Sequence, residues 1–182
     1  MLPKHLAVGV LVCVGSALAP ATTLAPTTTA KLIERAERVC CARCDAIEAR
    51  KDPRSGIVFT HVRLTLLEDM KGVSPAGTIA LRLVGGRADG VETAVAGMPR
   101  FRVGAESVLL LGKRNRDGYP VVMQARRGVL HLSKDKRGTR FVANTVTGVE
   151  ECKGKGRIRL DALRAGVKRL VRDAAARAQG GK

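Results

Sequence analysis

Aromatic residues are scarce in this 182-residue chain, which has no tryptophan, one tyrosine and three phenylalanines. A barrel that grips single-stranded nucleic acid usually stacks the bases on exposed aromatic rings, and so few rings provide little surface for stacking. Attraction of phosphate to the basic residues alone would give salt-sensitive binding without sequence preference. The composition therefore disfavours nucleic acid as a partner.

The common catalytic motifs are also missing. No serine lies in a Gly-x-Ser-x-Gly turn, and neither a Glu-x-x-His helix nor a Gly-x-x-x-x-Gly-Lys-Ser/Thr loop is present. The acidic pairs Glu68-Asp69 and Glu150-Glu151 are adjacent in sequence, so on an extended strand their carboxylates face opposite ways. His61 and His131 fit surface or edge positions of strands. We therefore predict no catalytic residues, no metal site and no cofactor.

Only one apolar run is long, and it lies near the first residue. Lys4 precedes the run from Leu6 to Ala19, which is shorter than the ~20 helical residues that cross a bilayer. This is the pattern of a secretory signal, with an uncleaved anchor as the other interpretation. The alternative cleavage sites follow Ala17-Leu18-Ala19, Ala19-Pro20-Ala21 and Thr23-Leu24-Ala25. We expect residues 1–21 to be a signal peptide, residues 22–30 a spacer, and the protein to be secreted or periplasmic.

Acidic residues are outnumbered two to one, with 16 Asp and Glu against 33 Lys and Arg and a formal net charge of +17. Most of the excess lies in residues 113–140 and 157–182. We expect these stretches to contact another extracytoplasmic protein, or an anionic membrane or envelope polymer. The candidate contact residues are Arg126, Arg127, Lys134, Lys136, Arg137, Arg164, Lys168, Arg169 and Arg172.

Between residues 31 and 156 the apolar residues alternate with polar ones, which predicts a mainly β fold. Glycine-containing and charged turns separate the runs. Seven strands at this spacing indicate a small antiparallel barrel or sandwich. The expected strands span residues 39–49, 58–71, 79–83, 108–111, 119–123, 129–132 and 141–146.

Helical periodicity is confined to the two flanks of this region. Thr28 or Thr29 is placed to cap a short helix that continues to Glu37. Residues 157–182 form a basic tail in which a helix from about Arg159 to Ala178 carries an apolar stripe. Such an amphipathic helix either docks its stripe on the barrel or lies on anionic lipid, and the sequence leaves both open.

Four cysteines follow the signal: Cys40, Cys41, Cys44 and Cys152. In an oxidising compartment an even number favours disulfides, and we expect Cys152 to pair with one of the first three. Strand periodicity puts Cys40 and Cys44 on one face and Cys41 on the other. Cys41 and Cys44 also form a C-x-x-C, but a redox-active pair normally opens a helix in a thioredoxin-like unit, and here the motif lies before alternating strands.

The order of several short pieces between Ala36 and Leu111 resembles a group of small exported bacterial proteins, largely uncharacterised. These pieces are Ala36-Glu37-Arg38-Val39, Glu68-Asp69-Met70-Lys71-Gly72, Leu83-Val84-Gly85-Gly86, Gly97-Met98-Pro99-Arg100-Phe101, and Gly104-Ala105-Glu106 leading into Val108-Leu109-Leu110-Leu111. A long strand that ends in Lys71-Gly72 before a further strand is also similar to the netrin-like module of tissue metalloproteinase inhibitors.

The distant resemblance implies an OB-type barrel and favours binding over catalysis. Those inhibitors place a mature N-terminal cysteine on the zinc of a protease, whereas Cys40 and Cys41 lie well downstream of any cleavage site here. The sequence therefore predicts an exported, non-enzymatic binding or structural module. The alternatives are a protease-associated inhibitor or chaperone, and a thiol–disulfide protein that uses Cys41 and Cys44.

Overall fold

The computed structural model describes residues 27–73, 77–143, 145–154 and 157–180. The predicted signal peptide and residues 22–26 of the spacer lie outside these ranges. In chain order the elements are α1 (Thr29–Arg35), β1 (Arg38–Lys51), β2 (Val58–Lys71), β3 (Thr78–Val84), β4 (Gly86–Ala88), β5 (Val91–Thr93), β6 (Glu106–Arg114), β7 (Pro120–Val122), the 3-10 turn η1 (Ala125–Gly128), β8 (Val129–Lys134), β9 (Arg140–Val142), the 3-10 turn η2 (Glu150–Cys152), β10 (Ile158–Arg159) and α2 (Leu160–Gln179).

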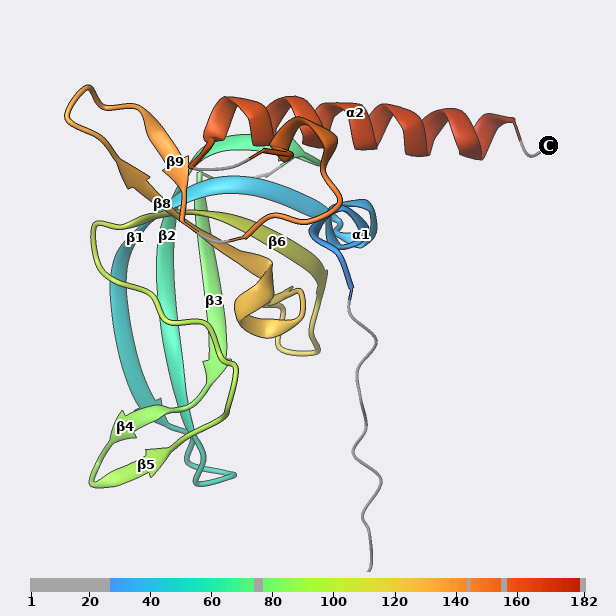
Figure 1. Ribbon diagram of the computed structural model, residues 1–182. Helices are drawn as coiled ribbons and strands as arrows, with labels where there is room; N and C mark the ends of the chain where they lie inside the picture. Colours follow the sequence, from blue (N-terminus) through green and yellow to red (C-terminus); the bar gives the residue numbers. More distant parts are fainter. Residues whose placement is uncertain (1–26, 74–76, 144, 155–156, 181–182) are drawn as a thin grey trace, which may run out of the picture.

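The predicted mainly β fold is confirmed. One antiparallel sheet has the order β10-β9-β8-β6-β1-β2-β3, with β7 paired to β6, and β4 and β5 form a separate hairpin (Figure 1). No pairing joins β3 to β10 among the described strands, so the sheet ends at both and does not close into a barrel.

Strand β1 forms the centre of the sheet and gives it its curvature. Its first half pairs with both β2 and β6, while its second half pairs with β2 alone. Register shifts interrupt the β1–β2 ladder at Val39/Cys40, Cys41/Ala42 and Cys44/Ala46. Irregularities of this kind bend a strand and increase its twist, so the long β1–β2 ribbon curls.

The two faces of the curled sheet bury two separate apolar clusters. The inner core lies between the strands themselves and contains Cys40, Ala42, Cys44, Val62, Leu64, Ile79, Leu81, Leu109, Leu111, Val122 and Val129. The helix-side core packs Val39, Cys41, Val108, Leu110 and Leu130 of the sheet against α1 and α2. Alternation along β1 thus sends Cys40 and Cys44 to one core and Cys41 to the other, as predicted.

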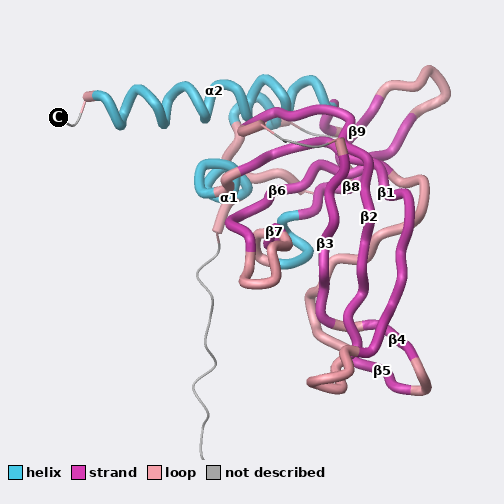
Figure 2. Tube along the Cα trace, turned by 180° about the vertical axis from the view of Figure 1, so that it is seen from behind, coloured by secondary structure: helices cyan, strands magenta, loops and turns pink. Residues whose placement is uncertain are grey.

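The C-terminal helix docks on the sheet. Its predicted stripe is buried at Leu160, Leu163, Val167 and Leu170 in the helix-side core. Figures 1 and 2 show α2 lying across one end of the sheet and past α1, with its C-terminal turns extending beyond the body of the protein. The apolar face that a membrane would need is therefore occupied by the protein itself.

Most strand predictions agree with the structure, and the disagreements have local causes. The N-cap is Thr28, whose hydroxyl accepts a bond from the backbone N–H of Lys31. The expected strand 141–146 ends at Val142, and Val146 is buried from an irregular segment instead. The β4–β5 hairpin was not predicted, because Gly86–Ala88 and Val91–Thr93 together contain one large apolar residue and so show no alternation.

Candidate binding cleft

A cleft of about 1770 Å³ lies at one end of the curled sheet. The end of β3, the β4–β5 hairpin and the segment 94–101 line it on one side. The turn η1 and the neighbouring part of β8 line it on the other. Thr27 to Thr29, Leu32, Ala143, Thr145 and Thr147 line it as well, so the cleft brings together parts of the chain that are far apart in sequence.

Four arginines and one carboxylate line this cleft. Arg87 and Glu92 form an ion pair of 3.2 Å across the β4–β5 hairpin, which neutralises both. Arg100, Arg126 and Arg127 are exposed and form no ion pair with any described residue. Three positive charges thus remain uncompensated in one concave surface, which concentrates a field that attracts anions.

Strained backbone presents two of these arginines. The residues immediately before them, Gln124 and Ala125, have φ of 45° and 52°, a left-handed conformation that destabilises a non-glycine residue by roughly 1–2 kcal/mol. The N–H of Arg126 donates to the carbonyl of Gly97 at 2.9 Å, which ties η1 to the opposite side of the cleft. Such strain persists only where surrounding contacts enforce it, and it gathers at functional segments.

The tight turn at η1 also depends on Gly128, the last residue of η1, which has no side chain. A Cβ there would collide with the backbone of Met123, so the chain can turn back this tightly only with glycine. The side-chain amide of Gln124 donates to Thr27 at 3.1 Å. Together these contacts hold η1 in one conformation.

Apolar side chains lie beside the arginines. Ile47 and Val95 line the cleft and are 39% and 42% exposed. Leu83 and Phe101 also line it and pack partly on the inner core. A surface that combines unpaired arginines with exposed aliphatic groups suits a partner that is both acidic and apolar.

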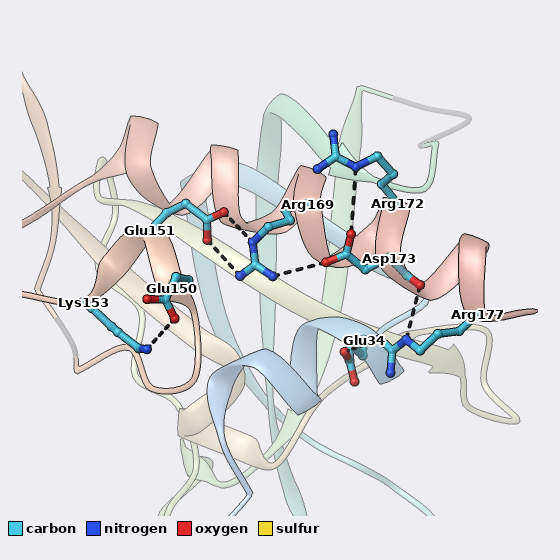
Figure 3. A network of polar contacts seen from close by, with 8 residues as sticks. All are labelled: Glu34, Glu150, Glu151, Lys153, Arg169, Arg172, Asp173 and Arg177. Carbon is cyan, nitrogen blue, oxygen red and sulfur yellow. Dashed lines mark hydrogen bonds and ion pairs between the residues drawn. The ribbon is translucent and has the colours of Figure 1, made fainter.

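The other predicted cations divide into free and paired side chains. Arg164 holds Glu68 through two bonds of 2.6 and 2.8 Å, and Lys134 contacts Glu106 at 2.6 Å. Arg169 bridges Glu151 and Asp173, as Figure 3 shows. These three cations have carboxylate partners within the protein, so their charges are at least partly compensated in the fold.

The remaining predicted cations are exposed but lie away from the cleft. Lys136 and Arg137 are at the tip of the β8–β9 hairpin, and Lys168 and Arg172 are on α2. Arg172 is 79% exposed and only 3.9 Å from Asp173. Only Arg126 and Arg127 of the predicted set lie in the cleft, where Arg100, which the sequence analysis did not select, joins them.

The expected disulfide is not formed. All four described cysteines are buried free thiols. Cys152 lies in the helix-side core, as Cys41 does, whereas Cys40 and Cys44 face the inner core. Burial raises the pKa of the Cys40 and Cys41 thiols to about 11, although the nearby arginines oppose the shift. A raised pKa keeps these thiols protonated and unreactive near neutral pH.

One serine–histidine contact was missed by the sequence analysis. Ser107 Oγ lies 3.1 Å from His131 Nδ1, because the two residues are register partners on β6 and β8. Burial lowers the pKa of His131. Ser107 is only 2% exposed, so a substrate cannot reach its hydroxyl. The pair is a cross-strand polar contact, visible only once the register is known.

Two structural features are absent from the described residues. No group of three or more His, Cys, Asp or Glu side chains gathers there in a way that could hold a metal ion. Nor is any described helix both long and apolar enough to span a bilayer. Comparison of the chain with family models, curated proteins and solved structures finds no match.

Proposed function

We propose that this protein is an exported binding module that holds an acidic, partly apolar segment of another extracytoplasmic protein in the cleft lined by Arg100, Arg126 and Arg127. The observation that carries the proposal is the set of three arginines without ion pairs beside exposed aliphatic side chains. An acidic segment supplies the missing counter-charges, and its apolar residues cover Ile47 and Val95.

The local energetics support this use of the cleft. Elsewhere in the described chain, cations such as Arg164 and Arg169 are satisfied by carboxylates. At η1 the chain instead adopts two strained residues and leaves both arginines unpaired. A preorganised turn also lowers the ordering entropy lost on binding, which strengthens association.

We also propose that the fold is a partly open OB/netrin-like barrel. The order β6-β1-β2-β3, with β8 on the far side of β6, agrees with a five-stranded Greek-key sheet that is not fully closed. Modules of this kind commonly serve as binding domains, which is consistent with a non-enzymatic role. The proposed export rests on the N-terminal signal pattern alone.

The binding proposal is tested by charge reversal. R126E/R127E should weaken binding of a fluorescent peptide of alternating Glu and Leu by at least about tenfold, which corresponds to ~1.4 kcal/mol. K136E/R137E is the matched control, because it changes the net charge equally at exposed positions outside the cleft. Fluorescence anisotropy at several salt concentrations measures both variants.

Two outcomes would contradict the proposal. Equal weakening by both double variants would show that the peptide responds to net charge and not to the cleft. Unchanged binding in R126E/R127E would exclude the cleft as the site. A pull-down from the exported fraction with the same two variants then identifies the natural partner as the protein lost only in R126E/R127E.

Export is tested separately. Residues 1–30 fused to a reporter should carry it out of the cytoplasm, and N-terminal sequencing of the exported protein should find cleavage after one of the three predicted sites. Retention of the reporter in the cytoplasm would refute the predicted signal peptide.

A further inference from the structure

A second pocket, of about 250 Å³, lies at the opposite end of β3 from the cleft. It is lined by the start of β3, from Thr78 to Ala80, whereas the cleft is lined by the end of the same strand. The first residue of β1 and the β6–β7 loop complete it. The two concavities therefore share no lining residue.

Arg38, the first residue of β1, lines this pocket with an unsatisfied donor. Its Nε is buried and has no hydrogen-bond partner, and the side chain forms no ion pair with any described residue. A buried donor on a charged group that lacks a partner destabilises the folded state, so such a group calls for a ligand or a counter-charge. Burial raises the pKa of the Cys40 thiol, which Arg38 lowers and Asp69 raises further, so a carboxylate lies in the same neighbourhood without pairing directly with Arg38.

Arg114 adds a second positive charge to the same pocket. One of its nitrogens donates to the carbonyl of Gly118 at 2.6 Å, and it too forms no ion pair with a described carboxylate. Asp117 is the one acidic residue that lines the pocket, and its carboxylate contacts Arg82 at 2.6 Å. Arg82 also pairs with Asp52, so the two guanidinium groups of the pocket are opposed by one carboxylate charge and the balance is positive by one.

Two other residues that line the pocket, Thr78 and Tyr119, carry neutral hydroxyl groups, which can donate hydrogen bonds. Guanidinium groups present several N–H donors in a rigid fork that matches phosphate and carboxylate oxygens. Two such groups together with hydroxyls match the several oxygens of a tetrahedral anion better than the two oxygens of a carboxylate.

We infer that this pocket binds a tetrahedral oxyanion, namely a phosphate or sulfate group, between Arg38 and Arg114. The volume equals the share of roughly eight water molecules in the liquid, which accommodates the anion together with a small attached group. Free phosphate, a phosphate ester of a small molecule and a lipid headgroup all present this chemistry. The inference does not depend on the cleft at η1.

Isothermal titration calorimetry with inorganic phosphate and with sulfate, each at constant ionic strength, tests the pocket. The wild-type protein should bind one anion per chain. R38Q and R114Q should each weaken that binding at least about tenfold, equivalent to ~1.4 kcal/mol. Because Arg114 is exposed, R114Q preserves folding even if R38Q does not.

The matched control is R116Q, which removes an exposed arginine of the same loop that does not line the pocket. It should leave the affinity within about twofold of the wild-type value. Absence of a saturable heat in the wild-type protein would overturn the inference, as would equal weakening in R114Q and R116Q. Loss of anion binding in R126E/R127E but not in R114Q would place the anion in the cleft and would also overturn it.

The source of the anion is decided by two further probes. Titration with glycerol phosphate and sedimentation with vesicles that contain phosphatidic acid are compared for wild type and R114Q. If R114Q weakens the binding of glycerol phosphate and the wild type does not sediment with the vesicles, the ligand is a soluble phosphate ester. If the wild type sediments with the vesicles and R114Q does not, the ligand is a lipid headgroup. Binding of peptide in the cleft should be unaffected by R114Q, so failure of one site is distinguishable from failure of the other.

Discussion

At the scale of single residues, the cysteines show how burial decides chemistry. Cys40 and Cys41 are adjacent, yet they lie in different cores, and burial raises the pKa of both thiols to about 11. Burial raises the pKa of the Cys44 and Cys152 thiols as well. The C-x-x-C therefore lacks the stabilised thiolate that thiol–disulfide exchange requires.

Native thiol labelling checks this state. With a pKa of about 11, only about 0.1% of the Cys40 and Cys41 thiols are ionised at pH 8. We expect negligible modification of the four described cysteines by iodoacetamide in the folded protein and rapid modification in guanidinium chloride. Mass spectrometry reads the result. Fast native labelling, or a mass lower by two hydrogens that resists alkylation after unfolding, would contradict free buried thiols.

Backbone strain at η1 gives a second prediction for a single residue. Ala125 has φ 52°, and glycine adopts this conformation without steric penalty. A125G should therefore raise the free energy of unfolding by up to ~1 kcal/mol, after the entropy of the more flexible unfolded chain is subtracted. A175G, in the exposed part of α2, should instead lose ~1 kcal/mol. Urea unfolding measures the free energy of unfolding of both variants. An equal loss of stability in A125G and A175G would show that Ala125 is not strained.

At the scale of elements, α2 is held by close packing at Gly166. A Cβ on this residue would collide with Val149 and meet the carboxylate of Glu151, so the helix approaches η2 only because Gly166 has no side chain. The glycine sits inside a helix, where it is intrinsically unfavourable. Packing therefore overrides helix propensity here.

The variant G166A separates the two effects. Helix propensity alone predicts a gain of ~1 kcal/mol, whereas the collision predicts a loss of about 1–3 kcal/mol, so we expect a net loss of stability. A165L adds a larger side chain at the exposed neighbouring position and should change stability by less than ~0.5 kcal/mol. If G166A were more stable than the wild type in urea unfolding, α2 would be able to shift away from η2 without loss of stability.

The ion pair between α2 and β2 makes a pH-dependent contribution. The bonds from Arg164 hold the pKa of Glu68 below its ordinary value of 4.5, although burial opposes the shift. Because the folded-state pKa is the lower one, the stabilisation is complete above pH 4.5 and is lost as pH falls through the folded-state pKa.

The variant R164A should therefore be about 1 kcal/mol less stable than wild type at pH 7. This difference should shrink as the pH is lowered below 4.5. R172A, which removes a cation that is 79% exposed, should change stability by less than ~0.5 kcal/mol. Denaturant titrations between pH 3 and pH 7 measure all three proteins. A difference that stays constant over the whole range would mean that Arg164 stabilises by packing alone.

At the scale of the whole molecule, stability depends on α2 as the cover of one core. Leu160, Leu163, Val167 and Leu170 complete the helix-side core, and burial of four such side chains contributes on the order of 6–12 kcal/mol. This is comparable to the total stability of a typical domain. The exposed turns that extend beyond the body contribute little by the same argument.

Two truncations test this division of the helix. Removal of residues 160–182 should abolish cooperative unfolding, because the helix-side core is then open to water. Removal of residues 175–182 should leave the thermal midpoint nearly unchanged, since residues 175–179 are exposed. Circular dichroism melts report both. A cooperative melt in the longer truncation would show that the sheet and α1 form a stable core by themselves.

Periodicity predicted the elements well where they are long enough to show a pattern. The alternation in β1 and β2 and the stripe of α2 specify strand or helix locally, and Thr28 caps α1 as expected. The β4–β5 hairpin and β10 were not predicted, because Gly86–Ala88, Val91–Thr93 and Ile158–Arg159 each contain at most one large apolar residue and so show no alternation. Export and the signal peptide stay predictions of the sequence.

The candidate site was only partly predictable, and arginine shows why. Arg126 and Arg164 are the same residue type in equally basic surroundings, and the sequence marked both as contacts. Arg164 is used internally because the fold brings it to Glu68, which is 96 residues away. Arg126 stays unpaired because η1 directs it into a cleft with no free carboxylate.

The sequence by itself determined the β character, the face of the sheet on which each cysteine of β1 lies, and the apolar stripe of α2. These properties follow from the local geometry of strands and helices. Only the tertiary structure decided which cations are free, whether α2 docks and which thiols share a core. Such properties depend on residues distant in the chain, whose contacts exist only after the sheet register and the helix packing are set.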